Sequence, residues 1–273
     1  MEAGDAGGMV GAILTGTVMA DVERFEIDNV SLTYRGSVQV EGGDQLVAII
    51  KDIPAKELAN ELLAAAIAGA AGLPVPTAIL AFAPRDTGIG VGCPLNDGSG
   101  GLVFASANVG GTSVRQFYKS SPSPGTEVLI AERLASWVDA GKLYGFDSWI
   151  ANTDRNAGNL LFGAAGGIWL IDHARGFTGP AWIAADFDAS GEYANLLANW
   201  LTPLLDVEKR SEMAKDVGDA SDGWGRVMLD RLAEAAHVAA LLDAGDREAV
   251  LTFLADRAAH VPRLASRALG FLA

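Results

Sequence analysis

The sequence predicts an α+β fold of two lobes, a small β-rich lobe with one long helix and then a mainly helical lobe. Up to about residue 107, apolar residues form short runs between glycine-rich turns, as in β-strands, with one long stretch of helix formers among them. Beyond residue 108 they recur at helical spacing, and the 273 residues exceed the usual size of one domain. We therefore expect a leader over residues 1–28, partly disordered or packed on the first lobe, a first lobe over residues 29–107 and a second over residues 108–273.

The composition indicates a chain with a full hydrophobic core that does not bind polyanions in general. Half of its residues are hydrophobic. Its formal net charge of −14 argues against a nucleic-acid or anionic-membrane binder, because phosphate backbones require a cationic face. No stretch reaches the length of a membrane span. The single cysteine, Cys93, permits no internal disulfide, which favours a reducing, cytoplasmic location.

The first lobe is predicted to begin with a β-hairpin that ends in a lysine. Apolar residues alternate with polar ones from residue 29, and a turn signal at residues 41–44 precedes an apolar strand that ends at Lys51. Gly36 and Ser37 break the first strand, and a glycine there could let backbone amides approach an anion. These residues therefore predict either a phosphate-covering loop with a phosphate-binding lysine or a plain hairpin with a surface lysine.

A helix over residues 57–71 is predicted next. Pro54 suits its first turn, and Gly72 ends it. Glu57 and Glu61 lie four residues apart on one face, so either could point back to Lys51 and fix its position. The alternative is that both carboxylates are solvated.

The second lobe contains the most informative stretch, residues 146–177. Asp154 is followed five residues later by Asn159, and Asp172 follows the apolar run Ile168–Ile171. A carboxylate that orients an attacking hydroxyl, an asparagine shortly after it and a strand that ends in an aspartate are the catalytic parts of kinases. Amide and carboxylate oxygens suit Mg²⁺ that carries nucleotide phosphates. The residues therefore predict a phosphotransferase that uses ATP and Mg²⁺.

Three segments carry a resemblance to a known family. LANELLAAAIAGAAGLPVP (residues 58–76), NTDRNAGNLLF (residues 152–162) and WLIDHARGF (residues 169–177) together resemble the HipA-like kinases, a bacterial group with a fold similar to protein and phosphatidylinositol kinases. The resemblance covers residues 29–177 and implies a bilobal, protein-kinase-like fold.

The resemblance also implies roles for individual residues. Asp154 would orient and help deprotonate the acceptor hydroxyl, and Asn159 and Asp172 would hold Mg²⁺. Lys51 would contact the phosphates of ATP, and Glu61 would position Lys51. Gly36 and Ser37 would match the phosphate loop. The pair Asn152-Thr153 stands where ordinary protein kinases have His-Arg, and Ile171-Asp172-His173 replaces their Asp-Phe-Gly.

Several alternatives remain open at this point. The acceptor is predicted to be Ser or Thr of a protein. An aminoglycoside-phosphotransferase-like or lipid kinase that acts on a small molecule is the second interpretation, and a nucleotide-binding pseudokinase scaffold is the third. Arg155 could steady the transferred phosphate or form a structural ion pair. Trp182, Trp200 and Trp224 could line a substrate cleft, although core packing is the more favoured interpretation.

Overall fold

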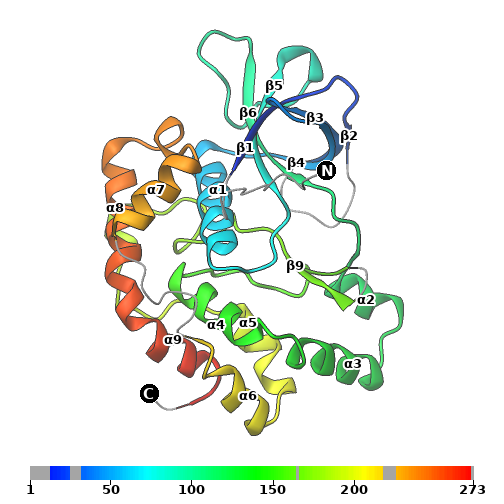
Figure 1. Ribbon diagram of the computed structural model, residues 1–273, viewed down its shortest axis with the longest axis vertical. Helices are drawn as coiled ribbons and strands as arrows, with labels where there is room; N and C mark the ends of the chain where they lie inside the picture. The colour runs from blue at the N-terminus through cyan, green and yellow to red at the C-terminus, as the bar shows by residue number, and fades with distance from the viewer. Residues whose placement is uncertain (1–12, 25–31, 164–165, 218–225, 272–273) are drawn as a thin grey trace, which may run out of the picture.

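The computed structural model describes residues 13–24, 32–163, 166–217 and 226–271; the start of the predicted leader and Trp224 lie outside these ranges. The predicted α+β fold, with a β-rich N-terminal region and a helical C-terminal part, is confirmed (Figure 1). The strands are β1 Leu14–Val18, β2 Glu23–Arg24, β3 Leu32–Val40, β4 Gln45–Asp52, β5 Ala78–Pro84, β6 Gly100–Ala107, β7 Thr112–Ser113, β8 Leu160–Phe162 and β9 Ile168–Leu170. The α-helices are α1 Ala55–Ala70, α2 Val114–Ser120, α3 Pro124–Ala135, α4 Ala140–Trp149, α5 Leu196–Trp200, α6 Val207–Met213, α7 Arg226–Ala235, α8 Ala244–Arg257 and α9 Val261–Ala268.

The N-terminal sheet closes on itself. Its strand order is β1-β5-β6-β4-β3-β2, and a further pairing of β1 with β3 joins the ends, so β1, β5, β6, β4 and β3 form a barrel with β2 attached to β3. β1 is parallel to β5 and antiparallel to β3. Small and branched side chains, including Val38, Ala48, Ile50, Ile79 and Val103, fill the interior. Closure gives β1 and β3 partners on both sides and so removes open edges.

The β3–β4 hairpin differs from its prediction in one respect. β3 runs without interruption through Gly36 and Ser37, which pair with Ala48 and Val47 on β4. The predicted break in the strand is therefore wrong. The glycine serves packing, because a Cβ atom at Gly36 would lie 2.8 Å from Cγ1 of Val22.

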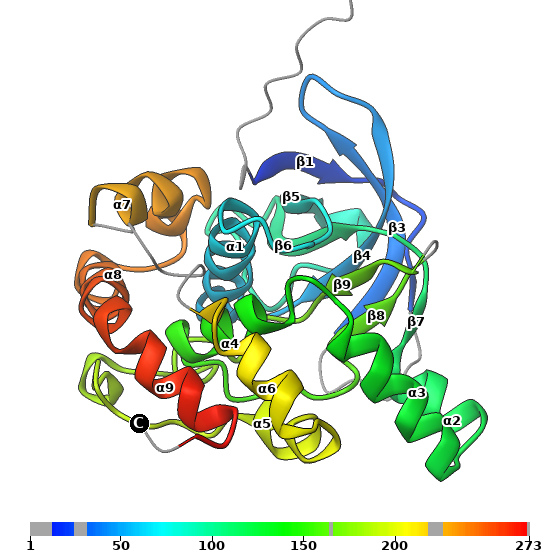
Figure 2. The ribbon, with the colours of Figure 1, turned by 60° about the horizontal axis from the view of Figure 1, so that its bottom comes forward.

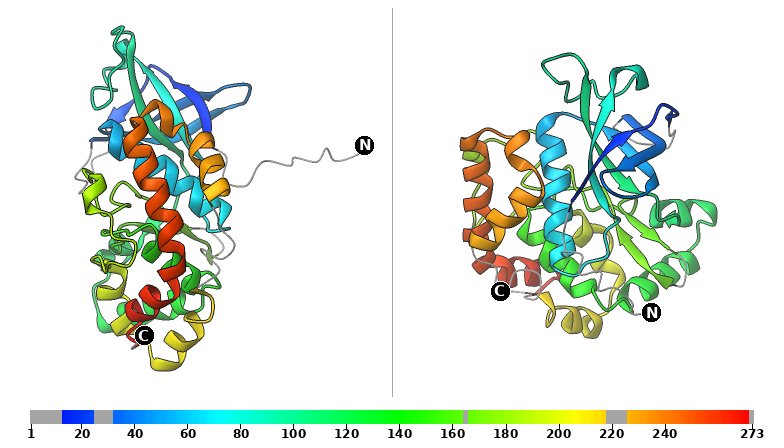
Figure 3. Two further views of the ribbon diagram at one scale, coloured as in Figure 1. Left: turned by 90° about the vertical axis from the view of Figure 1, so that its left-hand side faces the viewer. Right: turned by 45° about the horizontal axis from the view of Figure 1, so that its top comes forward.

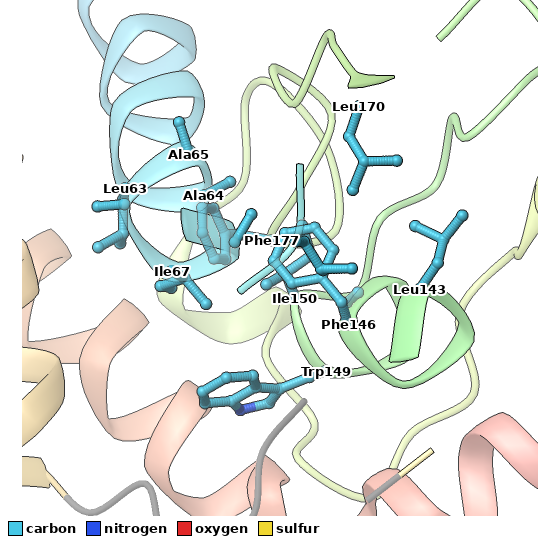
Figure 4. Packing of buried hydrophobic residues seen from close by; sticks show 14 of the residues in the cluster. Leu63, Ala64, Ala65, Ile67, Leu143, Phe146, Trp149, Ile150, Leu170 and Phe177 are labelled. Atoms are coloured by element: carbon cyan, nitrogen blue, oxygen red, sulfur yellow. The ribbon is translucent and has the colours of Figure 1, made fainter. Parts of the chain in front are cut away.

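Helix α1 packs against both the strands and the C-terminal helices. Every residue from Leu58 to Ala68 is buried, and six of these eleven are leucine, isoleucine or large polar residues spaced among alanines. Figure 4 shows Ala64 and Ile67 of α1 on the side toward aromatic and aliphatic side chains of α4 and the following segment, whereas Leu63 points to the opposite side. On its other side α1 lies alongside α7, with α8 next to it (Figures 2 and 3). A helix buried on all sides fixes whatever polar groups it carries.

The β8–β9 hairpin stands close to the start of the helical part. β7 pairs with β8, and β8 with β9, so that three short strands form a second sheet. Helices α3 and α4 of the helical part are separated by a turn. Trp182 is a core residue, as favoured, and Trp200 is partly buried against the same core.

Among the helices that the structure describes, none has both the length and the apolar composition needed to cross a bilayer.

Candidate active site

A cleft of about 1270 Å³ opens beside the β3–β4 hairpin, the β8–β9 hairpin and α2. That volume is sufficient for a nucleotide, since ligand pockets usually measure about 300–1,000 Å³. Four of the predicted site residues line it: Lys51, Asp154, Asn159 and Asp172. Gly36 and Ser37 are not among the described residues that line the cleft, because they lie within the middle of β3.

Lys51 joins α1 to the segment after β9. Its Nζ atom donates to Oε1 of Glu61 at 2.5 Å and to Oδ1 of Asp172 at 2.8 Å. Glu61 is fully buried, and its other oxygen accepts a hydrogen bond from the backbone N–H of His173 at 2.7 Å. Of the two glutamates that could point to Lys51, Glu61 makes the contact, and Glu57 lines the cleft one turn earlier.

Lys51, Glu61 and Asp172 shift one another's pKa values. Burial alone lowers the pKa of Lys51, but Asp172 and Glu61 outweigh it and raise that pKa above its ordinary value. Burial raises the pKa of Asp172, and the nearby Lys51 reverses this and lowers it to about 2. Burial also raises the pKa of Glu61, against the attraction of Lys51. With all three groups charged, one cation faces two carboxylates, which leaves one negative charge for an incoming cation.

Side chains of the loop before β8 form hydrogen bonds with both the backbone N–H and the backbone carbonyl of Asp154. The buried Asn152 accepts from the N–H of Asp154 at 3.1 Å, and Nδ2 of Asn159 donates to its carbonyl at 2.6 Å. Nδ2 of Asn156 donates to the Asp154 carboxylate at Oδ1, 3.1 Å away. The Asp154 side chain remains 32% exposed, and Nε of Arg175 lies 3.8 Å from its Oδ2. Asp154 is thus a fixed carboxylate that is open to the cleft.

Arg155, next to Asp154, points away from the cleft. Its side chain and that of Asp147 are both fully buried, and the guanidinium binds the carboxylate through two contacts of 3.0 Å. It also donates to the carbonyl of Ile171 at 2.8 Å and contacts Nδ1 of His173 at 3.0 Å. Arg155 therefore forms the structural ion pair and links this loop to both neighbours of Asp172.

Asn159 and Asp172 have donor atoms that fit a magnesium ion. The N–H of Ile171 donates to the carbonyl of Asn159 at 3.1 Å, which places Asn159 and Asp172 at one end of the hairpin. Asp172 has a left-handed backbone with φ of 61°, a conformation that aspartate tolerates better than most residues. The described residues contain no cluster of three or more His, Cys, Asp or Glu for a metal. Mg²⁺ commonly binds proteins through one or two carboxylate or amide side chains together with phosphate oxygens and water.

The cleft also contains cations to which the sequence analysis gave no role. Arg115 and Lys119 on α2, and Arg175 after β9, line it together with Lys51. Four of the chain's 20 lysines and arginines thus converge on one cleft of a protein with a net charge of −14. Arg115 and Lys119 are four residues apart in the sequence, and Arg175 follows Asp172 by three residues. These spacings were the available signals, but α2 itself was not predicted.

A lysine paired with a glutamate, two aspartates and an asparagine at one cleft are the kinds of residue that kinases use for phosphoryl transfer. The comparison with protein families agrees: the HipA-like kinase family matches residues 39–230. The chain belongs to the HipA-like kinase family, and the predicted resemblance is confirmed. The matched region includes Lys51 and all of residues 146–177. No curated protein matches the chain.

Proposed function

We propose that this protein is a bilobal, protein-kinase-like enzyme that uses ATP and Mg²⁺ to phosphorylate a hydroxyl group, with Ser or Thr of a protein as its acceptor. The observation that carries the proposal is the contact of Lys51 with both Glu61 and Asp172 in the cleft that also contains Asp154 and Asn159. A buried lysine held between two carboxylates is costly for stability, and such an arrangement is common at functional sites.

The nucleotide is expected to lie along the wall formed by the two hairpins. Leu32, Ile49 and Leu161 provide apolar side chains for the adenine ring, and Leu32 is 41% exposed there. Asn108 and Gly110 follow β6 on the same cleft, where backbone groups can meet the edge of the base. In this orientation the phosphates extend toward Lys51.

The reacting groups follow from that position. Asn159 and Asp172 would hold Mg²⁺, which when bound supplies positive charge for the phosphates. Asp154 would accept a hydrogen bond from the acceptor hydroxyl and aim its oxygen at the γ-phosphorus. The new bond joins that oxygen to phosphorus, the bond from the γ-phosphorus to the bridging oxygen breaks, and its electron pair leaves with ADP. The acceptor proton passes to Asp154.

Two substitutions test this assignment. Asp154→Ala should abolish transfer from labelled ATP while nucleotide binding persists, because only the acceptor loses its partner. Asp172→Ala should weaken binding of Mg²⁺ and ATP itself, measured by calorimetry. Asp256→Ala, an exposed residue of α8, is the matched control and should change neither. Undiminished turnover in Asp154→Ala would end the proposed mechanism.

Mass spectrometry of the same reactions identifies the acceptor class. Phosphate on a serine or threonine, of this chain or of an added protein, supports the protein-kinase assignment. Label found only on added aminoglycosides or lipids would replace it with the small-molecule alternative. Thermal stabilisation by ATP and Mg²⁺ without any transfer would replace it with the pseudokinase scaffold.

A further inference from the structure

The loop between Asp154 and Asn159 provides no cation to the phosphoryl group that is proposed to be transferred beside it. Its one basic residue, Arg155, is fully buried and bound to Asp147. The transferring phosphoryl group carries charge on three oxygens, and kinases and GTPases stabilise that charge with a positioned cation. Any cation that acts on these oxygens in addition to Lys51 and Mg²⁺ therefore comes from an element outside this loop.

Arg115 is bound to this loop at two points. Its backbone N–H donates to the carbonyl of Ala157 at 2.9 Å, and its Nη2 atom donates to Oδ1 of Asn156. Nδ2 of the same Asn156 donates to Oδ1 of Asp154 at 3.1 Å. One asparagine side chain thus connects the guanidinium to the proposed catalytic carboxylate.

Gly158 leaves the space beside the loop open for the guanidinium of Arg115. A Cβ atom on Gly158 would lie 3.2 Å from Cζ and 3.4 Å from Nε of Arg115. These distances are tighter than ordinary van der Waals contact, so any side chain there would push the guanidinium out of place. The absence of a side chain lets the planar group lie directly against the loop.

The rest of α2 is anchored as well. Ser113 caps the helix by accepting from the N–H of Gln116 at 3.1 Å, and it pairs with Leu161 on β8, the strand that begins just after Asn159. Arg115 is therefore attached to the same hairpin as the proposed metal ligand. A group held in this way requires little rearrangement when charge develops near it.

The charge of Arg115 is also uncompensated. Within the described part of the chain no carboxylate lies within ion-pair distance of its guanidinium. Arg175, the other arginine of the cleft, instead lies 3.8 Å from Asp154 and interacts with Glu57. Of the two, Arg115 is the one with donors and charge to spare for an anion.

We propose that Arg115 is a further catalytic residue, whose guanidinium binds the oxygens of the transferring phosphoryl group and is oriented toward them by Asn156 and Gly158. This inference rests on the proposed kinase function. In the step itself the acceptor oxygen bonds to the γ-phosphorus as the bridging bond to ADP breaks, and Arg115 neutralises the charge on the three oxygens between them. Arginine suits this position because its flat, forked donors match a phosphoryl group.

The test measures binding and turnover separately. ADP, Mg²⁺ and aluminium fluoride together mimic the planar transferring group, whereas ADP and Mg²⁺ alone do not. Thermal unfolding midpoints of the full chain are compared with each mixture for the wild type, Arg115→Ala, Arg115→Lys and Gly158→Ala. Arg247→Ala, an exposed arginine of α8, is the matched control. The midpoint without ligand shows that each variant folds.

We expect the wild type to gain stability from aluminium fluoride beyond that from ADP and Mg²⁺. Arg115→Ala should lose that additional gain, keep the gain from ADP and Mg²⁺, and transfer phosphate at least about 100-fold more slowly with little change in the KM for ATP. Arg115→Lys should recover only part, and Gly158→Ala should fall in the same direction.

Two results would overturn the inference alone: an aluminium fluoride gain retained in full by Arg115→Ala, or a higher KM for ATP with an unchanged kcat. The latter would show that Arg115 binds ATP equally in the ground and transition states. A wild-type chain that ATP or ADP with Mg²⁺ does not stabilise would instead overturn the proposed function, and this inference with it.

Discussion

The buried pair of Asp147 and Arg155 gives the sharpest prediction about stability. Asp147→Asn keeps the shape of the side chain, so no cavity forms, but it leaves the fully buried guanidinium without a counter-charge. Arg155 would keep neutral acceptors, among them the carbonyl of Ile171 and Nδ1 of His173, but would lose its anionic partner. Removing one member of a buried pair costs about 3–5 kcal/mol. Because whole domains are stable by only about 5–15 kcal/mol, this loss would be large.

Urea unfolding followed by tryptophan fluorescence measures this loss. Trp149 lies on α4 two residues after Asp147 and is fully buried, so it reports on the region. The control is Asp230→Asn, which removes one of the two carboxylates bound to Arg226, in a pair where Asp230 is 54% exposed. Such exposed pairs contribute about 0–1 kcal/mol. Equal losses in the two variants would refute the argument that the buried pair of Asp147 and Arg155 stabilises the loop before β8.

Two further predictions concern other buried groups. The Asn60 amide donates to the carbonyls of Ala174 and Gly179 and accepts from Nε1 of Trp182. Asn60→Ala should therefore raise hydrogen–deuterium exchange in residues 173–182 but not in α3. Exchange in residues 173–182 equal to that of the wild type would contradict this. The pKa of Tyr144 is raised by burial above its ordinary 10.0, so the stability that its neutral hydroxyl contributes is present below about pH 10 and lost as pH rises further. From about pH 9 to about pH 11 the wild type should therefore lose more unfolding free energy than Tyr144→Phe, and parallel losses would count against that shift.

The parts of the site that the sequence analysis predicted all have local signatures. Lys51 ends an apolar strand, Glu61 lies on a helix with clear boundaries, and Asp172 follows a short strand. Each belongs to a contiguous pattern whose period can be counted. The contact of Lys51 with Glu61 spans only ten residues, the end of β4 and less than two turns of α1, so it could be predicted from helix geometry.

The missed features depend on contacts between distant segments. Closure of the barrel requires β1 to pair with β5, more than sixty residues later by the register Leu14 to Ile79. Gly36 looked like a loop glycine because the pattern does not reveal that Val22 packs over it. Arg115 lies on a short helix with little periodicity, and its partner Asn156 is 41 residues away. No single window of sequence contains both halves of such an interaction.

The sequence around Arg155 indicated the chemistry of this residue but not the position of its side chain. Two interpretations of it were open, since an arginine beside a catalytic aspartate suits a phosphate as well as an ion pair. The decision depends on Asp147, which lies in a mostly apolar stretch of sequence that does not indicate its partner. Because that pair is buried, the Arg155 guanidinium points away from the cleft, and in the proposed reaction an arginine that binds the phosphoryl group comes from outside the loop. Because Arg155 is buried with Asp147, Arg115 is the arginine bound to this loop that lines the cleft.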